Sequence, residues 1–208
     1  MRAFILVILS LLLGISGSRQ LANQFSTANM SQTLQVALAQ GVMIENIDTH
    51  GGFHGDGQSL TVWKFDDNSI LEQILTDPDW KELPMTDNLE ALLYGVVYDT
   101  GLSITEIGPC VDFSEEQLPQ IQNGYYYFVD RQAESEMQHS DAQIMERASL
   151  NFSIALYDVD TDTLYIISKW IHDIRFHAVS RNRHRAIILC LFFCVISVEK
   201  MPTSASGK

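Results

Sequence analysis

A run of aromatic and β-branched residues at Gly124–Val129 is the feature that most limits how this chain can fold. Such side chains suit the pleated, half-buried surface of a β-sheet, so the run predicts a strand. Two further apolar runs, Leu150–Tyr157 and Thr163–Ser168, lie on either side of an Asp-rich turn and predict a hairpin. We therefore expect this part of the chain to form neighbouring strands of one antiparallel sheet.

The segments before this run predict two more strands and two helices. Val42–Ile47 and Leu60–Phe65 have strand character and enclose a glycine-rich loop. Polar capping residues precede Ile70–Leu75 and Leu89–Tyr94, whose apolar side chains recur at helical spacing, and Gly95 ends the second helix. This order of elements predicts an α+β fold, a mostly antiparallel sheet with two or three helices on one face.

Composition divides the chain into four parts. We predict a signal peptide or anchor at residues 1–18, a polar linker at 19–40, a single α+β domain at 41–170, and an atypical basic and apolar tail at 171–208. A domain of this size buries a core without disulfide or metal staples. Only one cysteine, Cys110, lies in the domain, so the sequence predicts no disulfide framework.

The N-terminal segment has the pattern of an export signal. Arg2 precedes an apolar run of 13 residues, Ala3–Ile15, and small residues follow at 16–18. A bilayer span takes about 20 residues, so we predict cleavage after Ser18, with an uncleaved membrane anchor as the alternative. Either outcome predicts a secreted or extracytoplasmic protein, tethered to a membrane in the second case.

The C-terminal tail changes character after Trp170. It is rich in Arg and His up to Arg185 and is apolar from Ala186 to Val198. In an exported protein the basic flank would lie outside the cytoplasm, against the positive-inside preference, so this run makes a poor membrane span. Our hypothesis is that the tail comes from a shifted reading frame or a variant terminus. A genuine amphiphilic anchor is the alternative.

Negative charge dominates the domain. Residues 19–172 contain six Lys and Arg against 24 Asp and Glu, a formal net charge of −18. A surface this acidic repels phosphate backbones, so we predict no nucleic-acid partner. Two explanations stay open: the charge keeps an exported domain soluble, or it attracts cationic partners or divalent ions.

The segment 48–57, with the sequence DTHGGFHGDG, is the strongest candidate for a site. Its four glycines allow backbone conformations that other residues resist. Imidazole and carboxylate groups are the usual nitrogen and oxygen ligands of zinc and similar ions. His50, His54 and Asp56 are therefore the candidate ligands of a metal site, with a divalent cation as the candidate cofactor. The pattern favours instead a structural loop whose polar side chains bond their own backbone, and a catalytic dyad is the third explanation.

No catalytic set can be assembled from the sequence. Cys110 follows a Gly-Pro pair without a recognisable nucleophile context, and no Ser/His/Asp arrangement is apparent. The acidic turn at 158–162 lacks the glycine and the distal glutamate of a calcium loop. The sequence therefore predicts neither catalytic nor ligand-binding residues, and it favours a non-enzymatic role over enzymatic activity.

Five segments of the domain form a recognisable set of motifs: Thr49–Gly57, Trp80–Pro84, Leu92–Gly95, Gly124–Phe128 and Asn151–Ser153. Together they resemble a family of small exported bacterial proteins of unknown function that have a THGGFHGDG-like loop. The resemblance covers about residues 41–167, and it implies membership of the family without implying an activity. Members of the family end soon after the last strand, which supports the hypothesis of an altered tail.

These observations favour an exported, acidic domain that binds a protein or a small-molecule ligand at the cell surface. The second hypothesis is a metal-dependent hydrolase that uses the loop from His50 to Asp56. A third is a structural or inhibitor-like module, in which the same loop is a rigid surface presented to a partner.

Overall fold

The computed structural model describes residues 27–51, 55–99 and 104–172 of the 208-residue chain. The predicted leader at 1–18, the tail from residue 173 onward and His54 lie outside the described residues. No helix within the three described ranges is long and apolar enough to cross a membrane.

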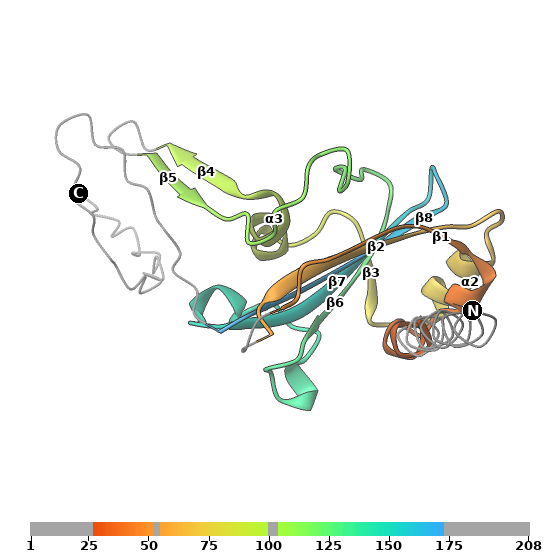
Figure 1. Ribbon diagram of the computed structural model, residues 1–208, viewed down its shortest axis with the longest axis horizontal. Coiled ribbons are helices and arrows are strands. Elements are labelled where there is room, and N and C mark those ends of the chain that lie inside the picture. Colours follow the sequence, from red (N-terminus) through yellow and green to blue (C-terminus); the bar gives the residue numbers. More distant parts are fainter. Residues whose placement is uncertain (1–26, 52–54, 100–103, 173–208) are drawn as a thin grey trace, which may run out of the picture.

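A six-stranded antiparallel sheet forms the centre of the fold, with the strand order β1-β2-β8-β7-β6-β3 (Figure 1). Its strands are β1 (Val42–Asp48), β2 (Gly57–Lys64), β3 (Trp80–Glu82), β6 (Gly124–Asp130), β7 (Leu150–Asp158) and β8 (Thr163–Ile171). The predicted α+β class and the mostly antiparallel sheet are confirmed. β3 was not predicted as a strand, because a three-residue edge strand is too short to show an alternating pattern.

Each face of the sheet has its own apolar cluster, because successive side chains of a strand point to opposite faces. On β7, Phe152 and Ile154 belong to the first cluster, whereas Ala155 and Tyr157 belong to the second. Strands β7 and β8 are therefore apolar on both faces over much of their length. Each of these faces must be shielded from solvent by other parts of the chain.

The helices cover both faces. The apolar side of α3 (Asp87–Tyr94) packs into the first cluster, and that of α2 (Ser69–Thr76) packs into the second, on the other side of the sheet (Figure 1). The expectation that the helices share one face is therefore corrected. The apolar pattern of a helix shows which of its sides is buried, but it does not show which face of the sheet receives that side.

Residues 27–40, which the sequence places in a linker, pack against the sheet. Residues 27–34 are helical, and η1 (Leu38–Gln40) follows as a short 3-10 helix. Leu34 and Val36 join the second cluster, and the indole N–H of Trp80 donates to the carbonyl of Leu34 at 3.0 Å. The described part of the predicted linker thus belongs to the folded domain.

The loop between β6 and β7 contains two 3-10 helices, η2 (Ser135–Met137) and η3 (Ile144–Glu146). An ion pair holds this loop to the end of β6, with 2.5 Å between Arg147 Nη1 and the Oδ2 atom of the buried Asp130.

Elsewhere, β4 (Val96–Asp99) and β5 (Ile104–Ile107) form a separate two-stranded hairpin that extends away from the main sheet (Figure 1).

Candidate functional site

The glycine-rich loop joins β1 to β2 and is closed by hydrogen bonds at its base. The backbone N–H of Thr49 donates to the carbonyl of Gln58 at 2.9 Å, and the backbone N–H of Gln58 donates to Thr49 Oγ1 at 3.0 Å. Gly57 lies so close to the other side of the loop that a Cβ there would be 2.5 Å from the Cα of His50. Glycine is therefore required at position 57, because the neighbouring atoms belong to the backbone.

His50 is paired with Asp48 in the preceding strand. Its Nδ1 atom lies 2.7 Å from Asp48 Oδ1, and its backbone N–H donates to the same oxygen at 2.9 Å. Burial alone would raise the pKa of Asp48, but the hydrogen bonds from His50 outweigh it and the pKa is lowered. Asp48 is thus an ionised carboxylate that orients the His50 ring.

Asp56 is paired with His172, a residue beyond the predicted domain boundary. The Nδ1 atom of His172 lies 2.6 Å from Asp56 Oδ1, and the backbone N–H of His172 donates to this oxygen at 3.2 Å. The His172 ring also stacks on Trp170, with ring centroids 5.6 Å apart and an interplanar angle of 26°. The loop is therefore connected to the end of β8.

The predicted metal site is divided between these two pairs. His50 bonds to Asp48, and Asp56 bonds to His172. His54 lies outside the described residues, so the three predicted ligands are not seen together. Within the described ranges, no group of three or more His, Cys, Asp and Glu residues is placed to hold a metal ion.

Polar residues gather on one face of the sheet at the same end as this loop. Ser59 of β2 lies opposite Asp48 of β1 and Ser168 of β8, and Ser168 lies opposite Ser153 of β7. Cross-strand partners share a face, so these four residues form a row across four strands. The Ser153 and Ser168 hydroxyls are hydrogen-bonded at 2.5 Å, which confirms that they point to the same side.

A second row runs parallel to the first, closer to the end of the sheet. Trp170 of β8 lies opposite Gly57 of β2 on one side and Asn151 of β7 on the other. Arg131, directly after β6, donates its backbone N–H to the carbonyl of Asn151 at 2.8 Å. We call the two rows together the polar patch: Asp48, Ser59, Ser153, Ser168, Asn151, Arg131 and Trp170.

Arg131 is the cation of the polar patch. Its Nη2 donates to Ser153 Oγ at 2.6 Å, and its Nη1 donates to Asn151 Oδ1 at 3.3 Å. It forms no ion pair with a carboxylate of the described residues. Among the Lys and Arg side chains of those residues, Arg147 is the one that pairs with a carboxylate. Loss of solvent against β7 lowers the pKa of the Arg131 guanidinium.

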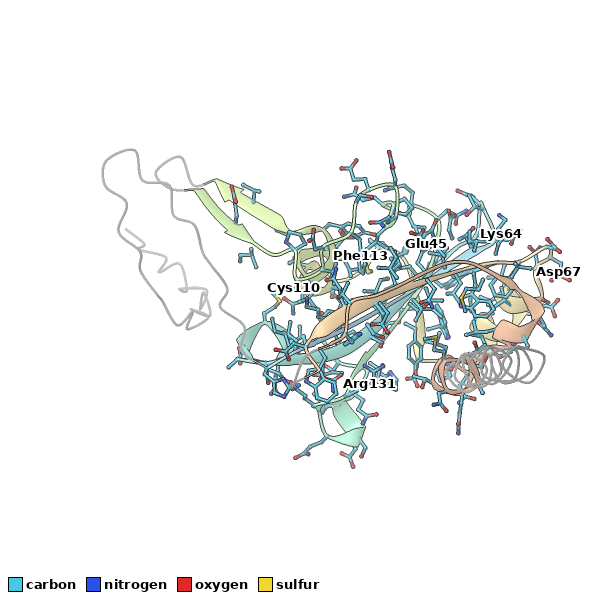
Figure 2. All side chains as sticks on the ribbon, in the orientation of Figure 1. Glu45, Lys64, Asp67, Cys110, Phe113 and Arg131 are labelled. Carbon is cyan, nitrogen blue, oxygen red and sulfur yellow. The ribbon has the colours of Figure 1, made fainter. Side chains whose placement is uncertain are left out.

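At this end of the sheet, other residues pack over one face more than over the other. Cys110 and Phe113 pack against the first cluster, and Figure 2 shows Arg131 on the other side of the sheet from them. Trp170 keeps 41% of its surface exposed, which is unusual for so large an apolar side chain. Arg131, Trp170 and Asp48 are exposed, whereas Ser153 is buried beneath them, so the polar patch is accessible through its exposed members.

A small cavity lies elsewhere, between α3 and the segment before β6. It has a volume of about 40 Å³, and Glu90 and Tyr94 are among its lining residues. Burial raises the Glu90 pKa, and repulsion by Asp87 adds to the effect. A volume this small holds one or two water molecules and is too small for an organic ligand.

Sequence reasoning missed Arg131, Trp170 and His172 as site residues. Asn151 and Ser153 appeared only as part of a family motif. A signal was available in β7 and β8, where Ser153 and Ser168 interrupt otherwise apolar strands. That signal identifies polar positions in a sheet, but it does not identify their neighbours on adjacent strands.

The resemblance to small exported bacterial proteins with a THGGFHGDG-like loop stays a prediction. No protein-family model, curated protein or solved structure matches this chain.

Proposed function

We propose that this chain is an exported, non-catalytic domain that binds a polar ligand on the polar patch. The observation that carries the proposal is Arg131, a cation without a carboxylate partner among the described residues, beside the Ser153 hydroxyl and on the same face as the exposed Trp170 two strands away. Charged, hydroxyl and aromatic side chains that converge on one accessible surface are typical of ligand sites. The predicted leader supports a location outside the cytoplasm.

The chemistry of the described nucleophiles also favours binding over catalysis. Burial raises the pKa of the Cys110 thiol to about 11, and an unreactive thiol is expected at such a value. Ser153 and Ser168 bond to each other, and Ser153 also bonds to Arg131. Neither hydroxyl has a general base among its hydrogen-bond partners in the described part of the chain, so neither is activated for nucleophilic attack.

A screen of the full chain against small probes tests this proposal. Thermal shift and NMR titration would use neutral sugars, acidic sugars, free amino acids and inorganic phosphate. We expect at least one probe class to bind, and its binding to be lost in both Arg131→Gln and Trp170→Leu.

The matched controls are Lys64→Gln and Leu75→Ala, which remove an exposed cation and an exposed apolar side chain far from the polar patch (Figure 2 labels Lys64). Both controls should bind as the unmodified chain does. Binding that persists unchanged in Arg131→Gln and Trp170→Leu would show that the site lies elsewhere.

The metal-dependent hydrolase is the second candidate, and one observation favours it. The Nδ1 atom of His50 lies 2.7 Å from Asp48 Oδ1, so Nε2 is the ring nitrogen that this contact does not use. Histidine ligands of metals are usually held by a carboxylate in this way. The proposed ligands are His50, His54 and Asp56, with a divalent cation.

Elemental analysis of the purified chain tests this candidate, together with thermal shift on addition of Zn²⁺ or Mn²⁺. The candidate requires a bound metal or a shift that is lost in His50→Ala and His54→Ala. It is rejected if neither ion binds or if both variants respond as the unmodified chain does.

A further inference from the structure

The donor groups of Arg131 are only partly used within the protein. A guanidinium has five N–H donors, and the hydrogen bonds to Ser153 and Asn151 use two of them. The other three have no acceptor among the described residues. A guanidinium with free donors matches the two oxygens of a carboxylate, which it binds in a bidentate arrangement.

The surroundings of Arg131 favour an anion. Arg131 is solvent-exposed, and the hydrogen-bond partners of its guanidinium are a neutral amide and a neutral hydroxyl. Its positive charge is therefore not paired with a carboxylate of the described residues. A bound anion supplies that opposite charge, which a neutral ligand does not.

The neighbouring side chains add further donors. Ser153 Oγ accepts from Arg131, and either of the Ser153 and Ser168 hydroxyls can donate to the other. Where Ser153 is the donor, the hydroxyl hydrogen of Ser168 is available to a ligand. The amide nitrogen of Asn151 and the hydroxyl of Ser59 have no hydrogen bond to another described residue. The part of the polar patch around Arg131 is therefore rich in donors, whereas the carboxylate of Asp48 lies three strands from Ser153. The ligand that matches the donors around Arg131 is rich in acceptors.

Trp170 adds an apolar surface to the site, because its ring stacks with that of His172 and still keeps 41% of its surface exposed. Its exposed ring lies in the same row as Asn151 and Arg131, two strands away from Arg131. Neighbouring strands are about 4.8 Å apart, so the two backbones are separated by about 10 Å. A pyranose ring has an apolar C–H face and a hydroxyl edge, and a length of one or two rings spans this separation.

The charge of the domain limits the ligand to few negative groups. Residues 19–172 have a formal net charge of −18, which repels a polyanion. An extended peptide is also disfavoured, because peptides bind sheets through free backbone groups at an edge strand. The backbone groups of β8 and β7 are already paired on both sides.

We propose that the ligand is a saccharide with one carboxylate, a hexuronate in an otherwise neutral sugar chain, whose carboxylate binds Arg131 and whose ring stacks on Trp170. The inference rests on the proposed function and specifies the ligand class for the same surface.

The test compares four probes on the full chain by NMR titration: methyl glucuronoside, methyl glucoside, acetate and N-acetyl-diglycine. We expect methyl glucuronoside to bind at least about tenfold more tightly than each of the others, a difference of about 1.4 kcal/mol. The shifted signals should include the Trp170 indole N–H and the backbone amides of Asn151 and Ser168.

Variants assign the preference to single side chains. Arg131→Gln should reduce the affinity for the glucuronoside to that for the glucoside, and Arg131→Lys should give an intermediate value, because it keeps the charge without the fork. Trp170→Leu should weaken both sugars. Lys64→Gln should change neither affinity. Circular dichroism of each variant checks that it is folded, and the signal shifts of the unmodified chain test the site independently.

Three results would overturn the inference. They are a glucuronoside that binds no more tightly than the glucoside, a preference that survives in Arg131→Gln, and tighter binding of acetate or of the peptide acid. If another probe class from the wider screen binds at the polar patch instead, the ligand class is wrong and the proposed function stands. If none binds there, both fail.

Discussion

The ion pair between Asp130 and Arg147 allows a quantitative test of what stabilises the strand end that carries Arg131. Asp130 is 1% exposed, the Arg147 side chain is 22% exposed, and their charged atoms are 2.5 Å apart. The other carboxylate oxygen of Asp130 accepts the backbone N–H of Gln132 at 2.9 Å. Asp130 immediately precedes Arg131, so these contacts fix the strand end from which the Arg131 guanidinium extends.

Removing one partner of this pair is expected to cost much more than removing both. Asp130→Ala leaves the largely buried Arg147 without its carboxylate, which typically costs about 3–5 kcal/mol. The partial exposure of Arg147 favours the lower end, about 3 kcal/mol, and loss of the bond from Gln132 adds about 1 kcal/mol. In Asp130→Ala/Arg147→Met the unpaired charge is absent, so the expected cost falls to about 1–2 kcal/mol.

Urea denaturation at pH 7, followed by circular dichroism, measures both free energies of unfolding. Glu136→Ala is the matched control, because Glu136 is an exposed carboxylate in the same loop and should change stability by less than about 0.5 kcal/mol. A double variant that is no more stable than Asp130→Ala would refute the reasoning, since burial of an unpaired charge could not then explain the loss.

Three further predictions concern the loop, one carboxylate and the cysteine of the domain. Gly57→Ala places a Cβ 2.5 Å from the Cα of His50 and should lower the free energy of unfolding by about 1–3 kcal/mol. Gly51→Ala, whose Cβ has no neighbour closer than 3.9 Å, should lower it by less than about 0.5 kcal/mol. Equal melting temperatures of the two variants would contradict this prediction. The pKa of Asp48 is lower in the folded chain than its ordinary value of 3.8, so its stabilising contribution is present above that value and is lost as the pH falls through the folded pKa. Melting curves of Asp48→Asn and the unmodified chain should therefore differ at pH 7 and converge below pH 3.8, and a constant difference would count against the pairing with His50. Burial raises the pKa of the Cys110 thiol to about 11. In a chain whose other two cysteines are replaced by serine, iodoacetamide at pH 8 should therefore react with Cys110 much faster in urea than in the native state. Similar rates in the two states would exclude a buried thiol.

The sheet could be predicted from the sequence because its central strands carry strong local signals. The aromatic run of β6 and the hairpin of β7 and β8 depend on residues that are adjacent in the chain. β3 depends instead on its pairing with β6, more than 40 positions away in the sequence. The face that each helix covers is likewise a property of the assembled sheet.

The glycine-rich loop was predicted as the site, and that prediction stays untested; the residue at its start, Asp48, belongs to the polar patch. The partners of its side chains were not predictable, because Asp48 ends one strand and His172 follows another that is distant in the sequence. The boundary placed at residue 170 separated His172 from the domain. That boundary followed a change of composition, whereas the hydrogen bonds to Asp56 continue past it.

The polar patch depends on the register of the sheet, which explains why local sequence patterns did not reveal it. Ser153 and Ser168 are neighbours because β7 and β8 pair with Leu150 opposite Ile171. A slip of one residue would turn every side chain of a strand to the opposite face, and Ser153 would then lie in the first apolar cluster. The apolar residues between these serines oppose such a slip, so the packing of the core also holds the serine hydroxyls beside Arg131.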